Sequence, residues 1–424
     1  MIPQLRRIAL GAGLIVSLAP AIGSAQHVHD EASPPEGEGR WHFGGSAIPL
    51  VTTVSPAYGG RTLTEGYLSQ PMLMVTVGEH DAALSLHSMV DFEGLTLERG
   101  ELNPGISGEG YVDRRHPHTY LHELVLAATR SFGTSRASIA IGKGFVAFGT
   151  QDPMMRPLVK YPVNHHLAQI LERALVTAAM RHGPALLEVS SFNGDEPTSP
   201  SDWPETKRFF DSWSARGTLF PLLGIEVQAS MARVKSPEIA TGGGLDQRKM
   251  SASFKYSDSA AVRRYLLVEF AKSAEYSGET RAFDFTSLLV EGELARGPLA
   301  FAARIERTDR PEEERLANVF RTARPAQDFN ILGKTRWTVA TAAVSRSVRM
   351  SGAQIAPFAE IARATPKAQL HPTVFEPRAF YGSRSLWSYS FGARLSVGVV
   401  HMSSGEYGAA TRHGASHAGM EGMD

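Results

Sequence analysis

The chain has no cysteine, no excess charge of either sign and, after its N-terminus, no long apolar run. The absence of cysteine excludes a disulfide scaffold and thiolate chemistry, and it suits the periplasm or the outer membrane. Lys+Arg and Asp+Glu number 43 each, which argues against nucleic acid as the main partner, because phosphate binding needs a basic surface. Without about 18 consecutive apolar residues, a membrane-embedded mature protein would have to be a β-barrel.

Catalytic signatures are also missing. The sequence contains no G-x-S-x-G motif, no P-loop and no H-E-x-x-H motif, and His122-Glu123 lacks a second histidine four positions on. Ser190 and Ser191 near Asn193 would fit the nucleophile of a barrel lipase, but no histidine stands at a convincing spacing. We therefore expect a protein that is not an enzyme.

The N-terminus has the pattern of a secretory signal peptide. A positive pair, Arg6 and Arg7, precedes an almost wholly apolar run, and small residues up to Ala25 provide a cleavage site. We expect residues 1–25 to be removed during export to the cell outer membrane. Residues 26–40 are mostly polar and acidic, and are expected to form a disordered lead-in.

Alternation of apolar and polar residues is clearest in residues 386–402. Successive strand side chains point to opposite faces, so this stretch has one face of large apolar side chains and one of small and polar ones. A tilted strand needs only about 9–11 residues to cross a bilayer core. The stretch therefore resembles a strand of an outer-membrane barrel. Its apolar face comprises Trp387, Tyr389, Phe391, Ala393, Leu395, Val397 and Val399.

Similar segments recur from residue 41 and predict an all-β fold, a transmembrane antiparallel β-barrel of about sixteen strands over residues 41–402. Short and long links alternate, as in bacterial barrels with short periplasmic turns and long outer loops. The last segment would close the sheet against the first. Leu167–Arg181 would also fit a helix on composition alone. The expected strands are 42–53, 67–78, 81–92, 119–131, 134–143, 167–181, 184–193, 211–221, 223–234, 247–257, 262–272, 282–294, 298–308, 330–346, 353–364 and 386–402.

The polar register of these segments supplies candidates for the inner wall. A barrel of this size can leave an aqueous lumen, so porin-like passage of small solutes is the first functional hypothesis, with outer-membrane lipid around the barrel. The candidates carry both signs of charge, and we expect no strong ion selectivity. The lumen-lining candidates are Glu226, Lys249, Lys255, Arg304, Glu306 and Arg394.

Histidines and carboxylates gather in two groups, which suggests a metal site. Imidazole and carboxylate are ligands that zinc and copper accept. Both groups lie where a long link meets a strand, on the same rim, about 10 Å apart at a strand spacing of ~4.8 Å. A shared polar cluster is therefore one interpretation, and hydrogen bonds that anchor the loops are the other. The candidate ligands are Asp113, His116, His118, His122, Glu123, His165 and His166.

The last residues, 403–424, are Gly-rich and lack alternation. We expect a flexible tail outside the barrel, on the periplasmic side. Histidine with methionine is a soft-to-borderline ligand set that would hold copper weakly, and a solvated low-complexity tail is the alternative. The tail candidates are His413, His417, Met420 and Met423.

The stretch VDRRHPHTYLHELVLA, followed by MRPLVKYPVNHHLAQ, resembles a largely uncharacterised family of Gram-negative proteins with an approximate DRQHPHD motif and then HRPS…P…HH. The resemblance covers about residues 108–193. It implies an outer-membrane-type β-barrel, sometimes linked with metal resistance, without an established catalytic activity. Arg115, Thr119 and Met155 depart from the family pattern, and the loss of an acid and a histidine weakens a metal site. The residues that carry over are Asp113, His116, Pro117, His118, Glu123, Arg156, Pro157, His165 and His166.

Two alternatives to an open porin remain at this stage. One is a copper- or zinc-binding surface or resistance-associated barrel whose lumen is plugged by its loops. The other is a soluble periplasmic β-protein. Whether loops occupy the interior of the barrel distinguishes the open porin from the plugged barrel.

Overall fold

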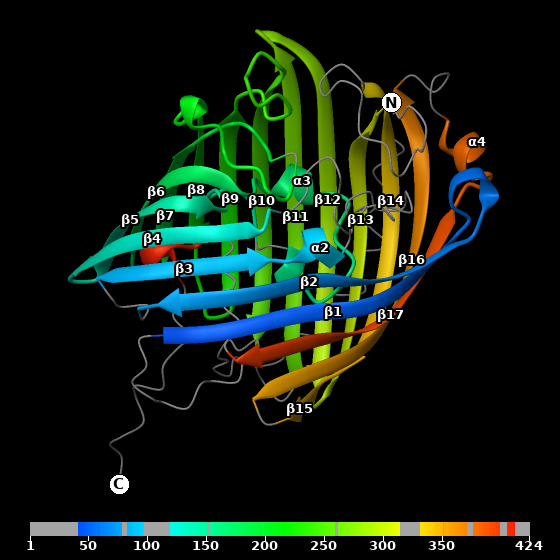
Figure 1. Ribbon diagram of the computed structural model, residues 1–424, viewed down its shortest axis with the longest axis horizontal. Coiled ribbons are helices and arrows are strands. Elements are labelled where there is room, and N and C mark those ends of the chain that lie inside the picture. Colours follow the sequence, from blue (N-terminus) through cyan, green and yellow to red (C-terminus); the bar gives the residue numbers. More distant parts are fainter. Residues whose placement is uncertain are drawn as a thin grey trace.

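The computed structural model describes residues 41–78, 83–96, 119–150, 153–197, 199–258, 262–313, 331–350, 352–370, 376–398 and 405–411. The regions expected as signal peptide and lead-in lie outside these residues. In the described ranges, no helix is long and apolar enough to cross a membrane. The strands (Figure 1) are β1 (Trp41–Ser55), β2 (Leu63–Val77), β3 (Leu84–Asp91), β4 (Leu121–Phe132), β5 (Ser135–Gly144), β6 (Arg173–His182), β7 (Ala185–Phe192), β8 (Ser212–Leu219), β9 (Ile225–Val234), β10 (Asp246–Asp258), β11 (Val262–Ser277), β12 (Thr280–Arg296), β13 (Leu299–Glu313), β14 (Ile331–Arg346), β15 (Val348–Met350), β16 (Ala353–Leu370) and β17 (Leu386–Gly398). The helical turns are η2 (Tyr58–Gly60), α2 (Glu93–Thr96), η3 (Pro153–Met155), α3 (His165–Ala168), η4 (Thr206–Arg208), α4 (Pro377–Tyr381) and η5 (Gly408–Ala410).

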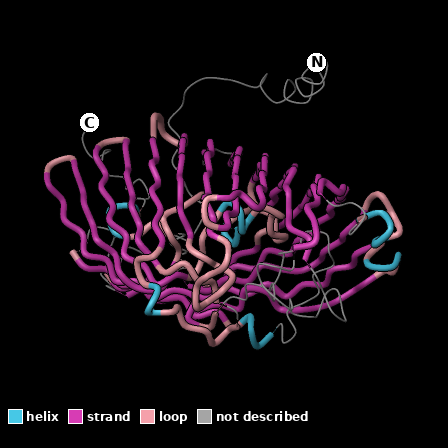
Figure 2. Tube along the Cα trace, turned by 90° about the horizontal axis from the view of Figure 1, so that it is seen from above, coloured by secondary structure: helices cyan, strands magenta, loops and turns pink. Residues whose placement is uncertain are grey.

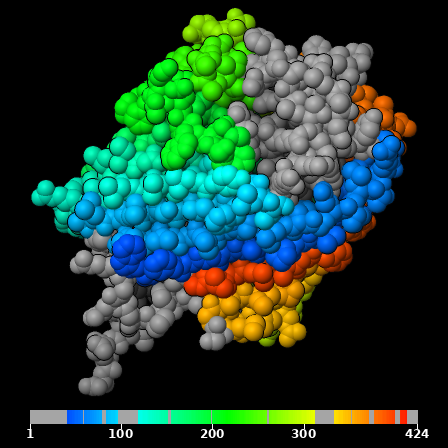
Figure 3. Space-filling view, viewed as in Figure 1, coloured from blue at the N-terminus to red at the C-terminus, as the bar shows by residue number. Residues whose placement is uncertain are grey.

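The strands form one closed antiparallel ring. Each strand from β1 to β13 pairs with the next along the chain, β14 pairs with β16, and β16 pairs with β17. The short β15 continues the position of β14 against β16. β17 pairs with β1 and closes the ring; Figure 3 shows the first strands, in blue, against the last strand, in red. The predicted sixteen-stranded antiparallel barrel is therefore confirmed.

The ring is polar inside and apolar outside. On β10, Lys249 and Lys255 face the interior and are buried, whereas Met250 and Phe254 are 55% and 37% exposed. A soluble protein arranges these residue types in the opposite way. The same period-two pattern that forms the strands therefore gives the outer surface its apolar belt.

Several strands differ from the expected boundaries: β13 and β16, for example, extend to Glu313 and Leu370 and not only to 308 and 364. Two further differences change how strands are connected. The sequence predicts a long link at 273–281, but β11 and β12 pair through this region and turn at Gly278, whose φ of 61° suits a two-residue hairpin turn. The predicted strand at 167–181 begins only at Arg173. The residues before it include α3 and belong to a segment inside the ring.

Ring closure requires a close approach of backbones between β17 and β1. Gly392 lies opposite Leu50 in the ladder. A Cβ at Gly392 would meet the carbonyl oxygen of Pro49 at 2.4 Å and Leu50 Cβ at 2.7 Å. On the inner side of this junction, the hydroxyls of Thr52 and Ser390 are hydrogen-bonded at 2.8 Å.

We predict that Gly392→Ala destabilises the barrel by about 1–3 kcal/mol, because an added methyl forces the two closing strands apart. The measurement is the thermal midpoint of unfolding of detergent-folded protein. The matched control is Gly217→Ala on β8, where no atom lies within 4 Å of an added Cβ. Equal midpoints for the two variants would contradict this account of closure.

Candidate functional site in the barrel interior

Residues 145–172, described except for 151–152, connect β5 to β6 through the inside of the ring, and we call them the inner segment. Most of their described side chains are buried. Its helix α3 packs against β10, β11 and β12, and in Figure 2 loop and helical segments lie inside the curve of the strands. A Cβ at Gly149 would meet the carbonyl oxygen of Ala168 at 1.6 Å, so the segment leaves and returns at nearly the same place.

Hydrogen bonds tie the backbone of the inner segment to strands on opposite sides of the ring. Backbone N–H groups that are removed from water need acceptors, and polar side chains of the wall supply them. One piece of chain therefore spans the interior from β7 to β16. The donations run from Ala147 to Ser190 (β7) at 3.2 Å, Gly149 to Ser230 (β9) at 2.9 Å, Val163 to Glu306 (β13) at 2.7 Å, and Val159 and Lys160 to Glu360 (β16) at 2.9 and 3.2 Å.

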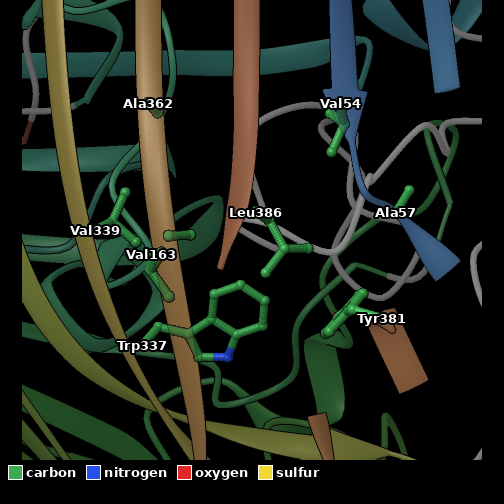
Figure 4. Close-up of a cluster of buried hydrophobic side chains, with 9 residues drawn as sticks. Val54, Ala57, Val163, Trp337, Val339, Ala362, Tyr381 and Leu386 are labelled. Carbon is green, nitrogen blue, oxygen red and sulfur yellow. The ribbon is translucent and has the colours of Figure 1, made fainter. Parts of the chain in front are cut away.

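Apolar contacts hold the inner segment against the remaining wall. Val163 packs in a cluster with Trp337 and Leu386, both 0% exposed (Figure 4). Met154 and Tyr161 pack with buried methionines of β2 and β3. Burial of each such side chain contributes about 1.5–3 kcal/mol, so the segment is a packed part of the barrel.

Arg156 and Glu269 form the first ion pair of the interior. Arg156 Nη2 donates to Glu269 Oε2 at 2.9 Å, and the side chains are 1% and 0% exposed. Thr150 Oγ1 also donates to this carboxylate, and Asn164 Nδ2 does so at 2.7 Å. A buried charge that loses its partner costs about 3–5 kcal/mol. The inner segment therefore supplies the partners that a charge on β11 requires.

Arg304 on β13 forms the second group of buried charges. Its guanidinium lies 3.1 Å from Glu291 Oε2 and 3.3 Å from Glu306 Oε1, and all three side chains are at most 1% exposed. Arg304 Nη2 also donates to the carbonyl oxygen of Lys160 at 2.7 Å. Wall charges and inner segment thus share one network.

Lys160 is a buried ammonium on the inner segment. Its Nζ donates to Ser388 Oγ at 2.6 Å. Burial lowers the pKa of Lys160 to about 8; the carboxylates of Glu360 and Glu306 oppose this shift, and Arg304 adds to it. The charge of this lysine therefore changes at mildly alkaline pH.

The end of the inner segment is anchored at His122 on β4. His122 is 0% exposed, and its Nδ1 lies 2.5 Å from Glu172 Oε1. Lys143 Nζ lies 3.6 Å from the other oxygen of Glu172, which also accepts the backbone N–H of Thr119 at 3.0 Å. The His122 ring meets that of Phe145 edge-on, with centroids 5.1 Å apart.

Residues 405–411 enter the interior after the last strand. Tyr407 is 1% exposed; its Oη accepts the backbone N–H of Phe145 at 2.9 Å and donates to Glu123 Oε2 at 3.1 Å. The N–H of Ala409 donates to a wall serine at 2.8 Å. The end of the described chain is therefore bonded both to the wall and to the start of the inner segment.

The prediction that residues 403–424 lie outside the barrel is wrong for 405–411. Arg216 Nη2 donates to the carbonyl oxygen of Gly405 at 3.0 Å, while Arg216 is itself held by Glu188 at 2.6 and 2.8 Å. Gly-rich composition suggested a solvated tail, but small residues also fit between an inner segment and a wall. The tail candidates, His413, His417, Met420 and Met423, lie outside the described residues.

The two histidine groups are placed only in part. His122 and Glu123 take part in the contacts above, whereas His165 and His166 lie on α3 with ring centroids 4.0 Å apart. Among the described residues, no group of three or more His, Cys, Asp or Glu side chains is arranged to hold a metal ion. The other candidates lie outside that part of the chain: Asp113, His116 and His118.

The lumen-lining candidates lie on the inner side of the ring. Lys255 Nζ is paired with Glu226 at 3.0 Å, and Lys249 Nζ donates to the carbonyl oxygen of His166 at 2.6 Å. Arg394 Nη2 donates to two carbonyl groups of the inner segment at 2.9 Å each. Five of the six are buried: Glu226, Lys249, Lys255, Arg304 and Glu306.

Sequence reasoning missed the wall residues that hold the inner segment and the tail. Glu269, Glu360 and Arg216 make several of these contacts, and each is a charged residue between two uncharged neighbours within a predicted strand. Such a charge between apolar neighbours, as in the run YLLVEF that contains Glu269, is the signal that would have identified them. Arg156 entered only through the family motif.

We predict that wild-type stability, relative to Lys160→Met, rises between pH 7 and pH 9.5. The unfolded lysine, with a pKa near 10.5, keeps its proton where the folded one, at about 8, has lost it, and stability rises with pH where the unfolded state binds more protons. The measurement is the difference in unfolding midpoint between the two proteins across this range. A difference independent of pH would contradict the assignment.

We also predict that Tyr407→Phe destabilises the protein by about 1–3 kcal/mol, because a buried N–H and a buried carboxylate each lose a partner. Unfolding followed by intrinsic tryptophan fluorescence measures this effect. Tyr389→Phe is the control, since Tyr389 lies on the outer face and is 38% exposed. The same midpoint for both variants would show that residues 405–411 are not bound as described.

Comparisons with known proteins give structural matches only. No protein-family description and no curated protein matches the sequence. A form of the outer-membrane protein OmpT of Vibrio cholerae that lacks loop L8 shares 11% identity, with a TM-score of 0.47 over 84% of this chain and 98% of that chain. The anion-selective porin of Comamonas acidovorans shares 10% identity, with a TM-score of 0.46 over 84% and 99%. OpdO of Pseudomonas aeruginosa shares 11% identity, with a TM-score of 0.39 over 85% and 98%. At these identities the likeness concerns the fold, which the strand pairing of this chain establishes by itself.

Proposed function

We propose that this protein is a porin-like barrel of the outer membrane that passes small polar solutes through an interior narrowed by the inner segment. The observation that carries the proposal is the inner segment itself, bonded to charged and polar wall residues from β7 to β16. Because this segment crosses the interior from β7 to β16, we expect it to exclude large solutes.

The outer surface supports membrane insertion. Outward side chains of successive strands are large and apolar, and a soluble protein rarely exposes a contiguous apolar surface of more than a few hundred Å². Examples are Ile139 at 60%, Leu187 at 57% and Phe301 at 60% exposed. This belt disfavours the soluble periplasmic alternative.

The interior supports selection by size more than by charge. A sixteen-stranded barrel can enclose an aqueous channel, but here the charges of the wall are largely neutralised by ion pairs such as Arg156–Glu269 and Arg304–Glu291. A solute that crosses must exchange its water for these fixed dipoles and charges. Small hydrogen-bonding solutes meet that condition best.

Metal handling is the second candidate. It rests on the family resemblance and on the histidines of residues 108–123 and 165–166. Its test is titration of folded protein with copper or zinc. Equal affinity after His116→Ala combined with His165→Ala would exclude a shared site.

We predict that replacing residues 150–167 with a short Gly-Ser linker raises single-channel conductance in planar bilayers several-fold. The linker can join Gly149 to Ala168 without moving β5 or β6, because those two residues already touch. Liposome swelling with sugars of increasing size should show a larger exclusion limit.

The control replaces the partly exposed residues 240–243 of the β9–β10 link with the same linker, and should conduct as the wild type does. Conductance of the wild type as high as that of the shortened variant would exclude constriction by the inner segment. Folded protein without channels in either form would contradict solute passage.

A further inference from the structure

Four cations gather on the outer face of β13, β14 and β16. Arg307, Arg363 and Lys367 are exposed, and the Arg336 side chain is 28% exposed. Each alternates with buried inward neighbours, such as Ala362 at 2% and Ala364 at 0% on either side of Arg363. These side chains therefore point away from the lumen, and solute passage does not use them. We call them the outer basic patch.

The strand register brings these cations together. Arg336 lies directly opposite Lys367, and neighbouring strands are about 4.8 Å apart. Like charges in directly opposed positions on one face of a sheet are destabilising. On the other side, Arg307 lies opposite Thr338, two residues from Arg336. An anion bound between these strands would remove the repulsion.

Carboxylates offset only part of this charge. Arg336 Nε lies 2.6 Å from Asp309 Oδ1. Asp309 is 2% exposed, and its carboxylate neutralises Arg336. Farther along β14, Lys334 lies 3.5 Å from Asp284. The patch of Arg307, Arg336, Arg363 and Lys367 keeps a net positive charge after Asp309 is counted.

The patch lies at the edge of the apolar belt. Arg363 is opposite Trp387 in the ladder, and its guanidinium lies 5.6 Å from the Trp387 ring centroid. Trp387 stacks on Tyr389 at 6.4 Å, and both rings face outward. Aromatic side chains of this kind mark the level of lipid headgroups in membrane barrels. Beyond them toward the opposite rim lie Ile361 and other apolar residues.

We propose that the outer basic patch binds the phosphate groups of a lipid, with the acyl chains lying on the apolar belt beside it. The inference rests on the proposed membrane insertion. Guanidinium groups bind phosphate in a bidentate manner with charge-assisted hydrogen bonds. The four residues lie in the halves of β13, β14 and β16 nearer the long links, which face the outer leaflet in a barrel with outer loops. The occupant is therefore the diphosphorylated disaccharide lipid of that leaflet, lipid A.

The test uses full-length protein folded in detergent micelles, with diphosphoryl and monophosphoryl lipid A of identical acyl chains as probes. Native mass spectrometry measures the apparent affinity of each. The wild type should bind the diphosphoryl form about tenfold more tightly, the effect of roughly one charge-assisted hydrogen bond. Arg307→Gln, Arg363→Gln and Lys367→Gln combined should remove this preference.

The matched control combines Arg130→Gln, Arg296→Gln and Arg346→Gln, which neutralises three exposed cations on the opposite rim and should keep the preference. A retained preference in the patch variant would overturn the proposal. Competition by inorganic phosphate at equal concentration would overturn the lipid assignment in favour of a soluble anion. Flotation with phosphatidylcholine vesicles is measured in parallel: protein that floats without discriminating the two lipids refutes only the patch, whereas protein that does not float refutes membrane insertion as well.

Discussion

A closed ring that carries ionised side chains on its inner face must neutralise them without the free access to water that a protein surface offers. The desolvation penalty of a buried ion is several kcal/mol, and Glu269, Glu291, Glu360 and Arg304 are at most 4% exposed. The inner segment answers this requirement with cationic side chains, backbone N–H groups and carbonyl groups. The charged residues of the wall and the path of the inner segment therefore depend on each other, because each neutralises or hydrogen-bonds groups of the other.

The same requirement explains why apolar and polar contacts alternate along the inner segment. Its N–H groups end on carboxylates of β13 and β16, while Val163 lies among Trp337 and Leu386. The apolar contacts fix its position, and the hydrogen bonds fix its register. Residues 405–411 complete the arrangement, because Tyr407 joins the start of the inner segment to β4. Two pieces of chain that are far apart in sequence thus lie together inside the ring.

Alternation in the sequence predicted the barrel, the number of strands and the closure of the last strand on the first, because a strand that faces lipid and lumen must repeat every two residues. The filling could not be predicted in this way. Apart from the short turns η3 and α3, the described part of the inner segment is irregular, and it takes its conformation from side chains of distant strands, such as Glu269 and Glu360. The Gly-rich stretch around Tyr407 likewise gave no sign that one aromatic residue would anchor it. Residues 273–281 were misjudged because a hairpin with a two-residue turn looks like a polar loop in sequence.

The contact between Gly149 and Ala168 has a consequence for how such a barrel can change over time. Since Gly149 and Ala168 touch, the chain between them is a closed loop, and its length is independent of the spacing of β5 and β6. Insertions, deletions or a different motif in that stretch are compatible with the same ring wherever the wall charges, such as Glu269 and Glu360, keep a partner or gain water. Related barrels could therefore keep the same strands and differ in the residues between Gly149 and Ala168, and so in the solutes that pass through the lumen.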